Sequence, residues 1–242
     1  SPLVILKKDR FVKQHGEIVK KTKRRLLLNL KKSGISRASR KYERGQLPRV
    51  LDPIFDALEN LRRHRHRRDV KVELEFIVLD FINAFFQFPV GRDELKFFVA
   101  KVRDFWYVFN RAAQGSRGGP LLCGRSLALA MRLATSTCPT GSVSCSTYVD
   151  DPLIGVVGTD SERKRTTAKL VGSLLALGFA LAFSKAQSTA NDQVITWTSA
   201  KLSVSGFTIT AEVKDAILDD IKHMLSDMNH VNVISLDDLK SF

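Results

Sequence analysis

The sequence predicts a mixed fold of the α+β class, with helices and antiparallel strands in one chain. A continuous apolar run ends in a carboxylate at residues 75–80, as in a strand whose two faces are both covered. Strand-like runs at 143–148 and 153–157, separated by a tight turn at 150–152, predict a hairpin. Helical spacing of apolar residues occurs in three further segments, at 54–61, 122–133 and 170–177.

The first predicted helix begins beside Asp52, a good N-cap residue, with Pro53 at the first helical position. Its apolar positions are Ile54, Phe55, Leu58 and Leu61. The arginine-rich run that follows, residues 62–68, is typical either of a nucleic-acid-binding patch or of a solvated linker. Both interpretations stay open at this point.

The second half of the chain continues the alternation of strands and helices. Strand-like runs at 96–101 and 105–109 predict another hairpin, and Pro120 then opens a helix. The residues that share a face of this helix are Leu122, Ser126, Leu129 and Leu133. The helix at 170–177 is expected to end at Gly178, which suits a C-terminal cap. The last predicted elements are strands at 195–202 and 207–210 and a helix at 213–225.

The chain carries a large excess of positive charge. Its 242 residues include 39 Lys and Arg against 25 Asp and Glu, a formal net charge of +14. Basic residues crowd residues 7–68, whereas the segment after Glu212 is acidic. This charge indicates a polyanionic partner, either nucleic acid or an anionic membrane surface, that binds the first two thirds of the chain.

Other features narrow the class of protein. The hydrophobic content of 44% is typical of a globular chain with a core. The longest apolar run, residues 174–183, is about half of the ~20 residues that a membrane helix needs, so no membrane partner is expected. Cys123, Cys138 and Cys145 lack the pattern of a disulfide framework or zinc site, which favours a reducing, intracellular compartment, cytoplasm or nucleus.

Two adjacent carboxylates in the predicted turn, Asp150 and Asp151, repel each other, and a cation would relieve the repulsion. Magnesium takes oxygen ligands and needs only a few carboxylates at a cleft. Asp80, at the end of the 75–80 strand, is the natural third ligand if that strand lies beside the hairpin. Two Mg²⁺ ions about 4 Å apart, or Mn²⁺ in their place, would then promote nucleotidyl transfer. Alternatively, these aspartates are ordinary turn and strand-end residues.

Three segments resemble motifs A, B and C of reverse transcriptases, in the right order. They read LDFINAFFQFP at 79–89, QGSRGGP at 114–120 and YVDD at 148–151. Looser matches are to motif D in GFALAFSKAQ at 178–187, to the motif E primer grip in VITWTSAKL at 194–202, and to a fingers strand in RRLLLNLK at 24–31. The chain is therefore similar to RNA-directed DNA polymerases of the retroviral and long-terminal-repeat retrotransposon type.

The resemblance implies roles for particular residues. The metal site would comprise Asp80, Phe81, Asp150 and Asp151. Lys185 would be the general acid that protonates the pyrophosphate leaving group, with a solvated surface lysine as the alternative. The nucleotide-binding residues would be Arg25, Phe85, Gln114, Gly115 and Tyr148. Trp197 and Thr198 would hold the primer, although Trp197 is equally a candidate core residue.

Phe85 matches the aromatic residue that, in this family, stacks under the sugar and blocks a 2′-hydroxyl, so the implied substrate is a deoxynucleotide. The alternative is a core phenylalanine in a continuation of the strand. Phe85, Phe86 and Phe88 cannot all point the same way in one strand, so at least one should face the cleft.

The fold that the resemblance implies is the right-hand polymerase fold, an antiparallel palm sheet backed by helices, with basic fingers and the start of a thumb. The fingers would comprise residues 1–70 and 95–118, the palm 71–94 and 119–205, and the start of the thumb 206–242. Expected partners are dNTPs and an RNA or DNA template with its primer. Because the chain starts at Ser1 and stops in mid-pattern at Phe242, we expect a piece of a longer polypeptide that can also carry RNase H or integrase domains.

Two other functions are weighed against this one. An RNA-dependent RNA polymerase shares the paired aspartates, but Phe85, Tyr148 and the motif E match disfavour it. A retroelement-derived domain that binds nucleic acid with weak or no synthesis would need only the cationic surface. The presence of all three predicted metal ligands argues against obvious inactivation.

Overall fold

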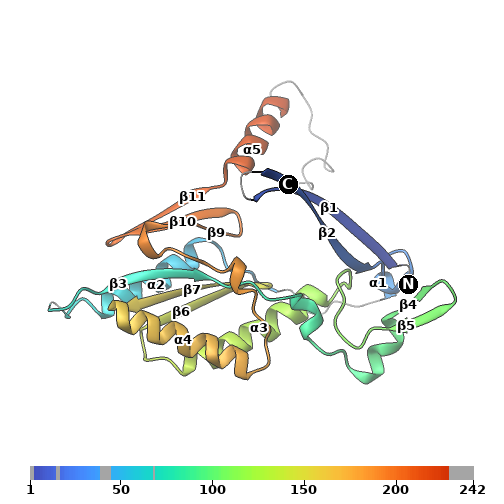
Figure 1. The fold of residues 1–242 in the computed structure, drawn as a ribbon, viewed down its shortest axis with the longest axis horizontal. Coiled ribbons are helices and arrows are strands. Elements are labelled where there is room, and N and C mark those ends of the chain that lie inside the picture. The colour runs from blue at the N-terminus through green and yellow to red at the C-terminus, as the bar shows by residue number, and fades with distance from the viewer. Residues whose placement is uncertain (1–2, 15–16, 39–44, 68, 229–242) are drawn as a thin grey trace.

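The computed structural model describes residues 3–14, 17–38, 45–67 and 69–228, and it confirms a mixed α+β chain with antiparallel sheets (Figure 1). The central sheet has the order β6-β7-β3-β8. Its strands are β3 (Glu73–Val78), β6 (Val143–Tyr148), β7 (Asp151–Gly158) and β8 (Gln187–Ser188). The other sheets are formed by β1 (Leu3–Gln14) with β2 (Glu17–Leu28), by β4 (Val99–Val102) with β5 (Phe105–Val108), and by β9 (Ile195–Trp197), β10 (Ala200–Ser205) and β11 (Thr208–Val213).

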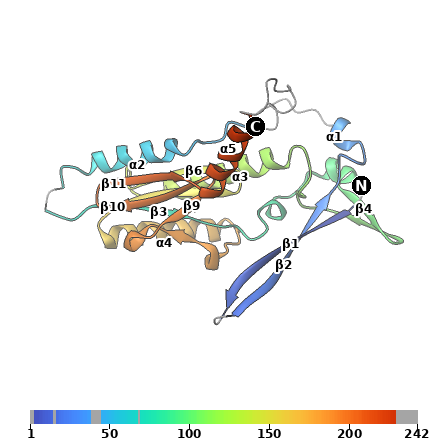
Figure 2. The same cartoon turned by 90° about the horizontal axis from the view of Figure 1, so that it is seen from above.

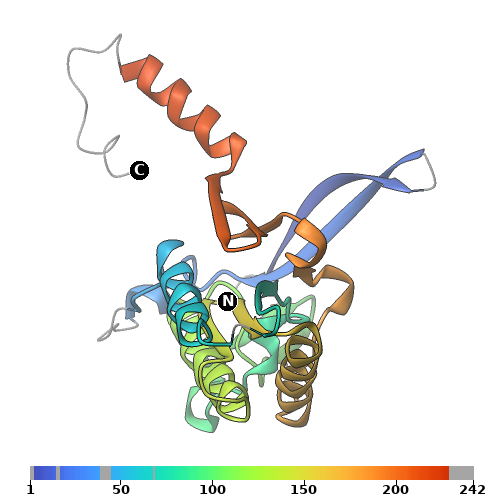
Figure 3. The ribbon, with the colours of Figure 1, turned by 90° about the vertical axis from the view of Figure 1, so that its left-hand side faces the viewer.

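Both faces of the central sheet are covered, because its inner strands are apolar on alternate sides. In β3, Phe76 and Val78 face a core formed with α2 (Leu51–Arg63) and the three-stranded sheet. Ile77 faces the opposite core, which lies against α3 (Gly119–Ser136) and α4 (Asp160–Ala176) (Figure 3). The end of β3 and the β6–β7 hairpin are therefore held from two sides.

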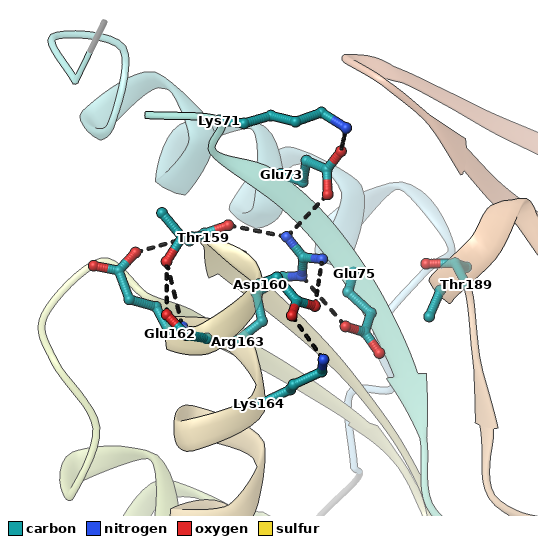
Figure 4. Close-up of polar contacts among 12 residues, drawn as sticks. Lys71, Glu73, Glu75, Thr159, Asp160, Glu162, Arg163, Lys164 and Thr189 are labelled. Atoms are coloured by element: carbon teal, nitrogen blue, oxygen red, sulfur yellow. Dashed lines mark hydrogen bonds and ion pairs between the residues drawn. The ribbon is translucent and has the colours of Figure 1, made fainter. Parts of the chain in front are cut away.

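An ion-pair network fixes α4 to the start of β3 (Figure 4). Thr159 caps the helix in a capping box with Glu162, whose carboxylate accepts a hydrogen bond from the Thr159 backbone N–H at 2.8 Å. The guanidinium of the buried Arg163 lies 3.2 Å from the Glu73 carboxylate and 3.4 Å from that of Glu75. Because Glu73 and Glu75 are alternate residues of β3, one arginine forms ion pairs with both.

The β1–β2 ribbon projects from one end of the molecule (Figure 2). At its base, the Leu28 N–H donates a hydrogen bond to the Gln114 carbonyl at 3.0 Å. Gly115 has a φ of 101°, and a Cβ there would lie 2.3 Å from the Leu28 carbonyl oxygen, so this junction requires glycine. The remaining helices are α1 (Ile35–Ala38), α5 (Asp215–Met228) and the 3-10 helices at Ala84–Gln87, Arg92–Phe97, Phe183–Lys185 and Ala190–Asp192.

The three main predicted helices exist, but two predicted details of α2 are wrong. Its N-cap is Val50, so Asp52 and Pro53 are the second and third helical residues, and the Asp52 carboxylate accepts a hydrogen bond from the Arg49 N–H at 2.7 Å. Phe55 and Leu58 are exposed, so only part of the predicted apolar face packs against the sheet. The C-terminus of α4 agrees with the prediction, because Gly178 follows it with a φ of 87°.

The apolar face predicted for α3 lies on its outer side. Leu122, Leu129 and Leu133 are exposed. The residues that α3 buries are Gly119, Cys123, Leu127, Ala130, Met131 and Ala134. Most of these side chains are small, which lets α3 approach β6 and α4 closely.

The predicted hairpin of β4 and β5 exists, but 3-10 helices replace the expected extended residues after Asp80 and at 96–97. Asn83 adopts a φ of 51°, and Ala84–Gln87 then turn, so the phenylalanines after Asp80 do not continue the strand. Arg92–Phe97 also turn, and the first strand of the next hairpin accordingly begins at Val99. No helix in the described part of the chain has the length and hydropathy needed to cross a membrane.

Candidate active site

Strand ends bring the predicted catalytic carboxylates to one edge of the central sheet. β3 pairs antiparallel with β7 and ends at Val78, two residues before Asp80. β7 begins at Asp151, which pairs with Tyr148 across the hairpin turn that contains Asp150. Asp80 therefore lies beside the hairpin that carries the two adjacent aspartates, as predicted.

The hairpin turn lies one residue earlier than predicted. Its central residues are Val149 and Asp150, because Asp151 and Pro152 already belong to β7. The pair next to a two-residue turn is hydrogen-bonded, so the following pair, Thr147 with Pro152, needs no proline N–H. Val149 has a φ of 56°, a conformation that favours glycine and that costs a branched residue about 1–3 kcal/mol.

The three carboxylates influence one another electrostatically. Partial burial raises the pKa of Asp151 above its ordinary value, although the residue reaches the surface, and the negative charges of Asp150 and Asp80 raise it further. The cationic Lys214 and Lys185 oppose this effect to a smaller extent. The ionised form of Asp151 is therefore disfavoured in the folded chain, and added positive charge nearby would stabilise it.

Lys185 forms an ion pair with Asp80. The segment that follows α4 runs back along the end of β3, and the Ala182 N–H donates a hydrogen bond to the Asp80 carbonyl at 2.8 Å. The 3-10 helix Phe183–Lys185 then places the Lys185 Nζ 2.9 Å and 3.0 Å from the two carboxylate oxygens of Asp80. This lysine thus neutralises one of the three predicted metal ligands.

The carboxylate oxygens of the three aspartates are suitable ligands for a hard divalent cation, but they do not converge on one position. Carboxylate oxygens are the ligands that Mg²⁺ prefers, and a cation would offset the repulsion on Asp151. Among the described residues, however, no three acidic, histidine or cysteine side chains lie close enough together to hold one ion. Binding of a cation would require Asp80 to exchange Lys185 for the ion.

The predicted aromatic residues differ in burial. The Phe81 ring is buried and meets Phe179 edge-on, with centroids 5.6 Å apart, so only its backbone is available to a ligand. Phe88 is also buried in this core. Phe85 is half-buried, and its ring would lie 3.4 Å from a Cβ added to Gly119, the first residue of α3.

Trp197 connects the β9–β10 hairpin to the aspartate hairpin. Its indole Nε1–H donates a hydrogen bond to the Asp151 carbonyl at 3.0 Å, while its ring is 1% exposed. The Tyr148 ring meets it edge-on, with centroids 6.5 Å apart. Thr198, in the next turn, accepts a hydrogen bond from the Lys214 ammonium group. Trp197 is thus a core residue that also fixes the backbone of a predicted catalytic residue.

Gln114 and Gly115 lie where the β1–β2 ribbon meets the approach to α3. The Gln114 carbonyl and the absent Gly115 side chain both serve the contact with Leu28, as described above. This packing accounts for the glycine without a ligand, so the predicted nucleotide contacts of these residues stay predictions. The side chain of Arg25 lies outside the part of the chain that the structure describes.

A cavity of about 190 Å³ lies at the aspartate edge of the sheet. The charged and amide side chains that line it are those of Asp80, Asp151, Lys185, Gln187 and Lys214. Gln187 and Lys214 were not predicted. Lys214 reaches the site only because β11 folds back along β10, which no local pattern indicates.

Gln87 is another residue that sequence reasoning missed. Its amide Nε2 donates to the carbonyls of Ile82 at 2.7 Å and Ala180 at 3.0 Å, and its Oε1 accepts from the Ala180 N–H at 3.0 Å. It therefore binds the segment after Asp80 to the segment that leads to Lys185. Its position inside motif A was the available signal.

No protein-family model matches the sequence, and no curated protein matches it. The fold, however, is similar to part of the foamy viral protease-reverse transcriptase. The alignment with that enzyme's dRH form in complex with double-stranded DNA has a TM-score of 0.58 and 16% identity, and it covers 99% of this chain and 36% of that chain. The alignment with the complex with an RNA/DNA hybrid has a TM-score of 0.55 and 19% identity, and it covers 90% of this chain and 25% of that chain. This chain thus spans about a third or less of those solved chains.

Proposed function

We propose that this chain is the polymerase portion of a retroelement reverse transcriptase, which transfers deoxynucleotides onto the 3′ end of a primer. The single observation that carries the proposal is the electrostatic coupling of Asp151 to Asp150 and Asp80 at one edge of the central sheet. Packing alone does not account for three mutually repelling carboxylates there. The similarity of fold to a reverse transcriptase supports the same function.

In this proposal Asp80, Asp150 and Asp151 hold Mg²⁺, which Mn²⁺ can replace, with a contact from the Phe81 backbone. The ions, when bound, activate the primer hydroxyl and stabilise the leaving oxygen. Lys185, once released from its ion pair with Asp80, would donate a proton from its ammonium group to the pyrophosphate.

The lobes follow the same proposal. Residues 1–70 and 95–118 are assigned to the fingers, 71–94 and 119–205 to the palm, and 206–242 to the start of a thumb, of which residues 229–242 lie outside the described part. Within 1–70, α2 and the segment after it belong with the palm instead, because α2 packs against the central sheet. Phe85, against the start of α3, selects deoxynucleotides by excluding a 2′-hydroxyl. Trp197 and Thr198 present the primer end through their link to Asp151 and Lys214.

The experiment is incorporation of labelled dTTP on poly(rA)/oligo(dT) with Mg²⁺ or Mn²⁺. Replacing both Asp150 and Asp151 by Asn should lower incorporation by about 100-fold or more, because metal stabilisation of the transition state is worth several kcal/mol. The matched control is Asp56→Asn, an exposed aspartate of α2, which should change incorporation less than about 2-fold. Excess UTP should not compete with dTTP unless Phe85 is replaced by Val. No incorporation by the wild-type chain would remove the enzyme proposal.

A second candidate is a domain that binds nucleic acid with little or no synthesis. The observation that favours it is the Lys185 ion pair, which already satisfies Asp80 without a metal. Under this alternative the wild type and the Asp150, Asp151 variant bind a primed template equally, and neither incorporates dTTP.

A further inference from the structure

We infer that a second nucleic-acid-binding site, specific for single strands, lies at the end of the central sheet opposite the aspartates. The site is a groove of about 820 Å³ between the C-terminal end of α2, the segment before β3, and the β10–β11 turn. We call it the arginine groove, and its cationic lining residues are Arg62, Arg65, Arg67 and Lys71. The inference does not depend on catalysis.

The floor of the groove is apolar and its rim carries an exposed aromatic ring. Leu61 and Val72 contribute to the floor. Phe207 stands at the tip of the β10–β11 turn, where the preceding Gly206 has a φ of 59°, and it is 78% exposed. The hairpin thus presents an exposed aromatic ring in the same groove as several arginines. This arrangement fits a single strand whose base stacks on the ring while its phosphates bind the cations.

Three of these cations have acidic neighbours, and phosphates can replace the neighbours of two of them. Arg62 lies 3.7 Å from Glu59, Arg67 lies 2.9 Å from Glu162, and Lys71 lies 2.5 Å from Glu73. The Arg62 and Lys71 side chains are well exposed, so their pairs can exchange with phosphates, whereas Arg67 holds Glu162 through two hydrogen bonds and keeps its partner. These exchangeable pairs keep the groove cationic towards a polyanion.

Arg65 differs from the other three, because it makes no ion pair with any described residue. Between residues 61 and 72 the sequence holds six Lys and Arg but one acidic residue, Asp69. The charge of this segment therefore favours a polyanion over a neutral apolar ligand.

The groove is distant from the predicted catalytic edge. Both sites lie along β3, the groove at Glu73 and the aspartate edge at Asp80, which at ~3.3 Å per strand residue separates them by about 20–25 Å. In Figure 1 the groove elements, the α2–β3 segment and the β10–β11 turn, lie at the left, away from the β1–β2 ribbon. A strand held in the groove would thus leave the aspartate edge accessible.

The test measures binding of a fluorescein-labelled oligo(dT) of about 20 nucleotides by fluorescence anisotropy, with the full chain. The groove variants are Arg65→Glu and Phe207→Ala. Each has a matched control outside the groove, Arg165→Glu on the exposed side of α4 and Phe55→Ala on the exposed side of α2. Each groove variant should weaken binding about 5-fold or more, whereas each control should stay within about 2-fold.

Ultraviolet cross-linking of the same oligonucleotide locates the contact. The peptide that contains Phe207 should carry the cross-link in the wild type, and Arg65→Glu should reduce its yield. Equal weakening by groove and control variants, or cross-links that avoid this peptide, would overturn the inference. Displacement of the oligonucleotide by polyglutamate at lower concentration than by unlabelled oligo(dT) would also overturn it, by assigning the groove to an acidic protein.

The outcome is separable from that of the polymerase proposal. The double variant of Asp150 and Asp151 should retain the Phe207 cross-link in full, and Arg65→Glu should incorporate dTTP on a primed template within about 2-fold of the wild type. Absence of incorporation by the wild type would therefore count against the polymerase alone.

Discussion

The two ends of strand β3 carry acidic residues in opposite electrostatic situations. At its start, the Glu73 and Glu75 carboxylates surround Arg163 (Figure 4), and Lys71 adds a hydrogen bond to Glu73. This hydrogen bond is the main reason that the pKa of Glu73 is lowered, with a smaller contribution from Arg163. The folded chain therefore favours the ionised carboxylate at this end.

Just beyond the other end of β3, the folded chain disfavours ionisation. The pKa of Asp151 is raised by burial and by the charges of Asp150 and Asp80. The strand thus begins at a carboxylate, Glu73, whose ionised form the fold stabilises, and ends beside one, Asp151, whose ionisation costs stability. A charge cluster that lowers stability is typical of a functional site.

The largest expected effect is at the start of the strand. Arg163→Ala leaves two partly buried carboxylates without their shared cation, so the free energy of unfolding should fall by about 3–5 kcal/mol. Urea denaturation measures this change. Arg165→Ala, two residues further along α4 and exposed, should change it by less than about 0.5 kcal/mol. Similar small losses in both variants would show that the start of β3 is not held by its charges.

At the aspartate end, the strongest single support is the Trp197 hydrogen bond. Trp197→Phe keeps most of the buried ring but removes one donor to the Asp151 carbonyl, which also pairs with Tyr148 across the hairpin, at a cost of about 1 kcal/mol in thermal or urea unfolding. Incorporation of dTTP should also fall, because the position of the aspartate hairpin depends on this contact. The exposed Trp106 provides the control, since Trp106→Phe should leave unfolding unchanged.

The strained turn allows a prediction of opposite sign. Val149→Gly should increase the free energy of unfolding by about 1 kcal/mol, because glycine accepts the positive φ without steric cost. Val194→Gly, at an exposed position without this conformation, should give no gain. A loss of stability in Val149→Gly would mean that packing of the valine outweighs the strain.

The smallest effect concerns pH. A raised pKa means that folded Asp151 binds its proton more tightly than the unfolded chain does, so the penalty of ionisation is absent below the ordinary pKa of Asp and grows as pH rises through the raised value. Asp151→Asn should therefore raise Tm at pH 7 but not at pH 3. Solvent screening limits the gain to about 1 kcal/mol, or ~2–4 °C in a calorimetric scan. Asp56→Asn should show no such difference between the two pH values.

The position of the aspartates could be predicted because each lies at the end of an apolar strand run, and such runs are local signals. The partner of Asp80 could not, since Lys185 is 105 residues away and reaches it only through the path of the segment after α4. The turn was placed one residue late because Pro152 suggests a turn, whereas at a non-hydrogen-bonded strand position proline costs nothing.

The sequence pattern also could not predict which face of α3 is buried. Apolar residues occur on all sides of this helix, so periodicity does not select the buried face. Close approach to β6 and α4 selects it, through small residues such as Cys123, Ala130 and Ala134.

The junction at Gly115 also has a mechanical consequence. Each strand of the β1–β2 ribbon has 12 residues, so the ribbon is about 40 Å long. At its base it is joined to the rest of the chain by the backbone contact between Leu28 and Gln114. A rotation of the ribbon by about 5° about this contact displaces its far end by about 3–4 Å. The aspartates lie on the other side of the contact and stay in place. A displacement of a few tenths of an ångström at one glycine is thus amplified roughly tenfold at the far ends of the two strands.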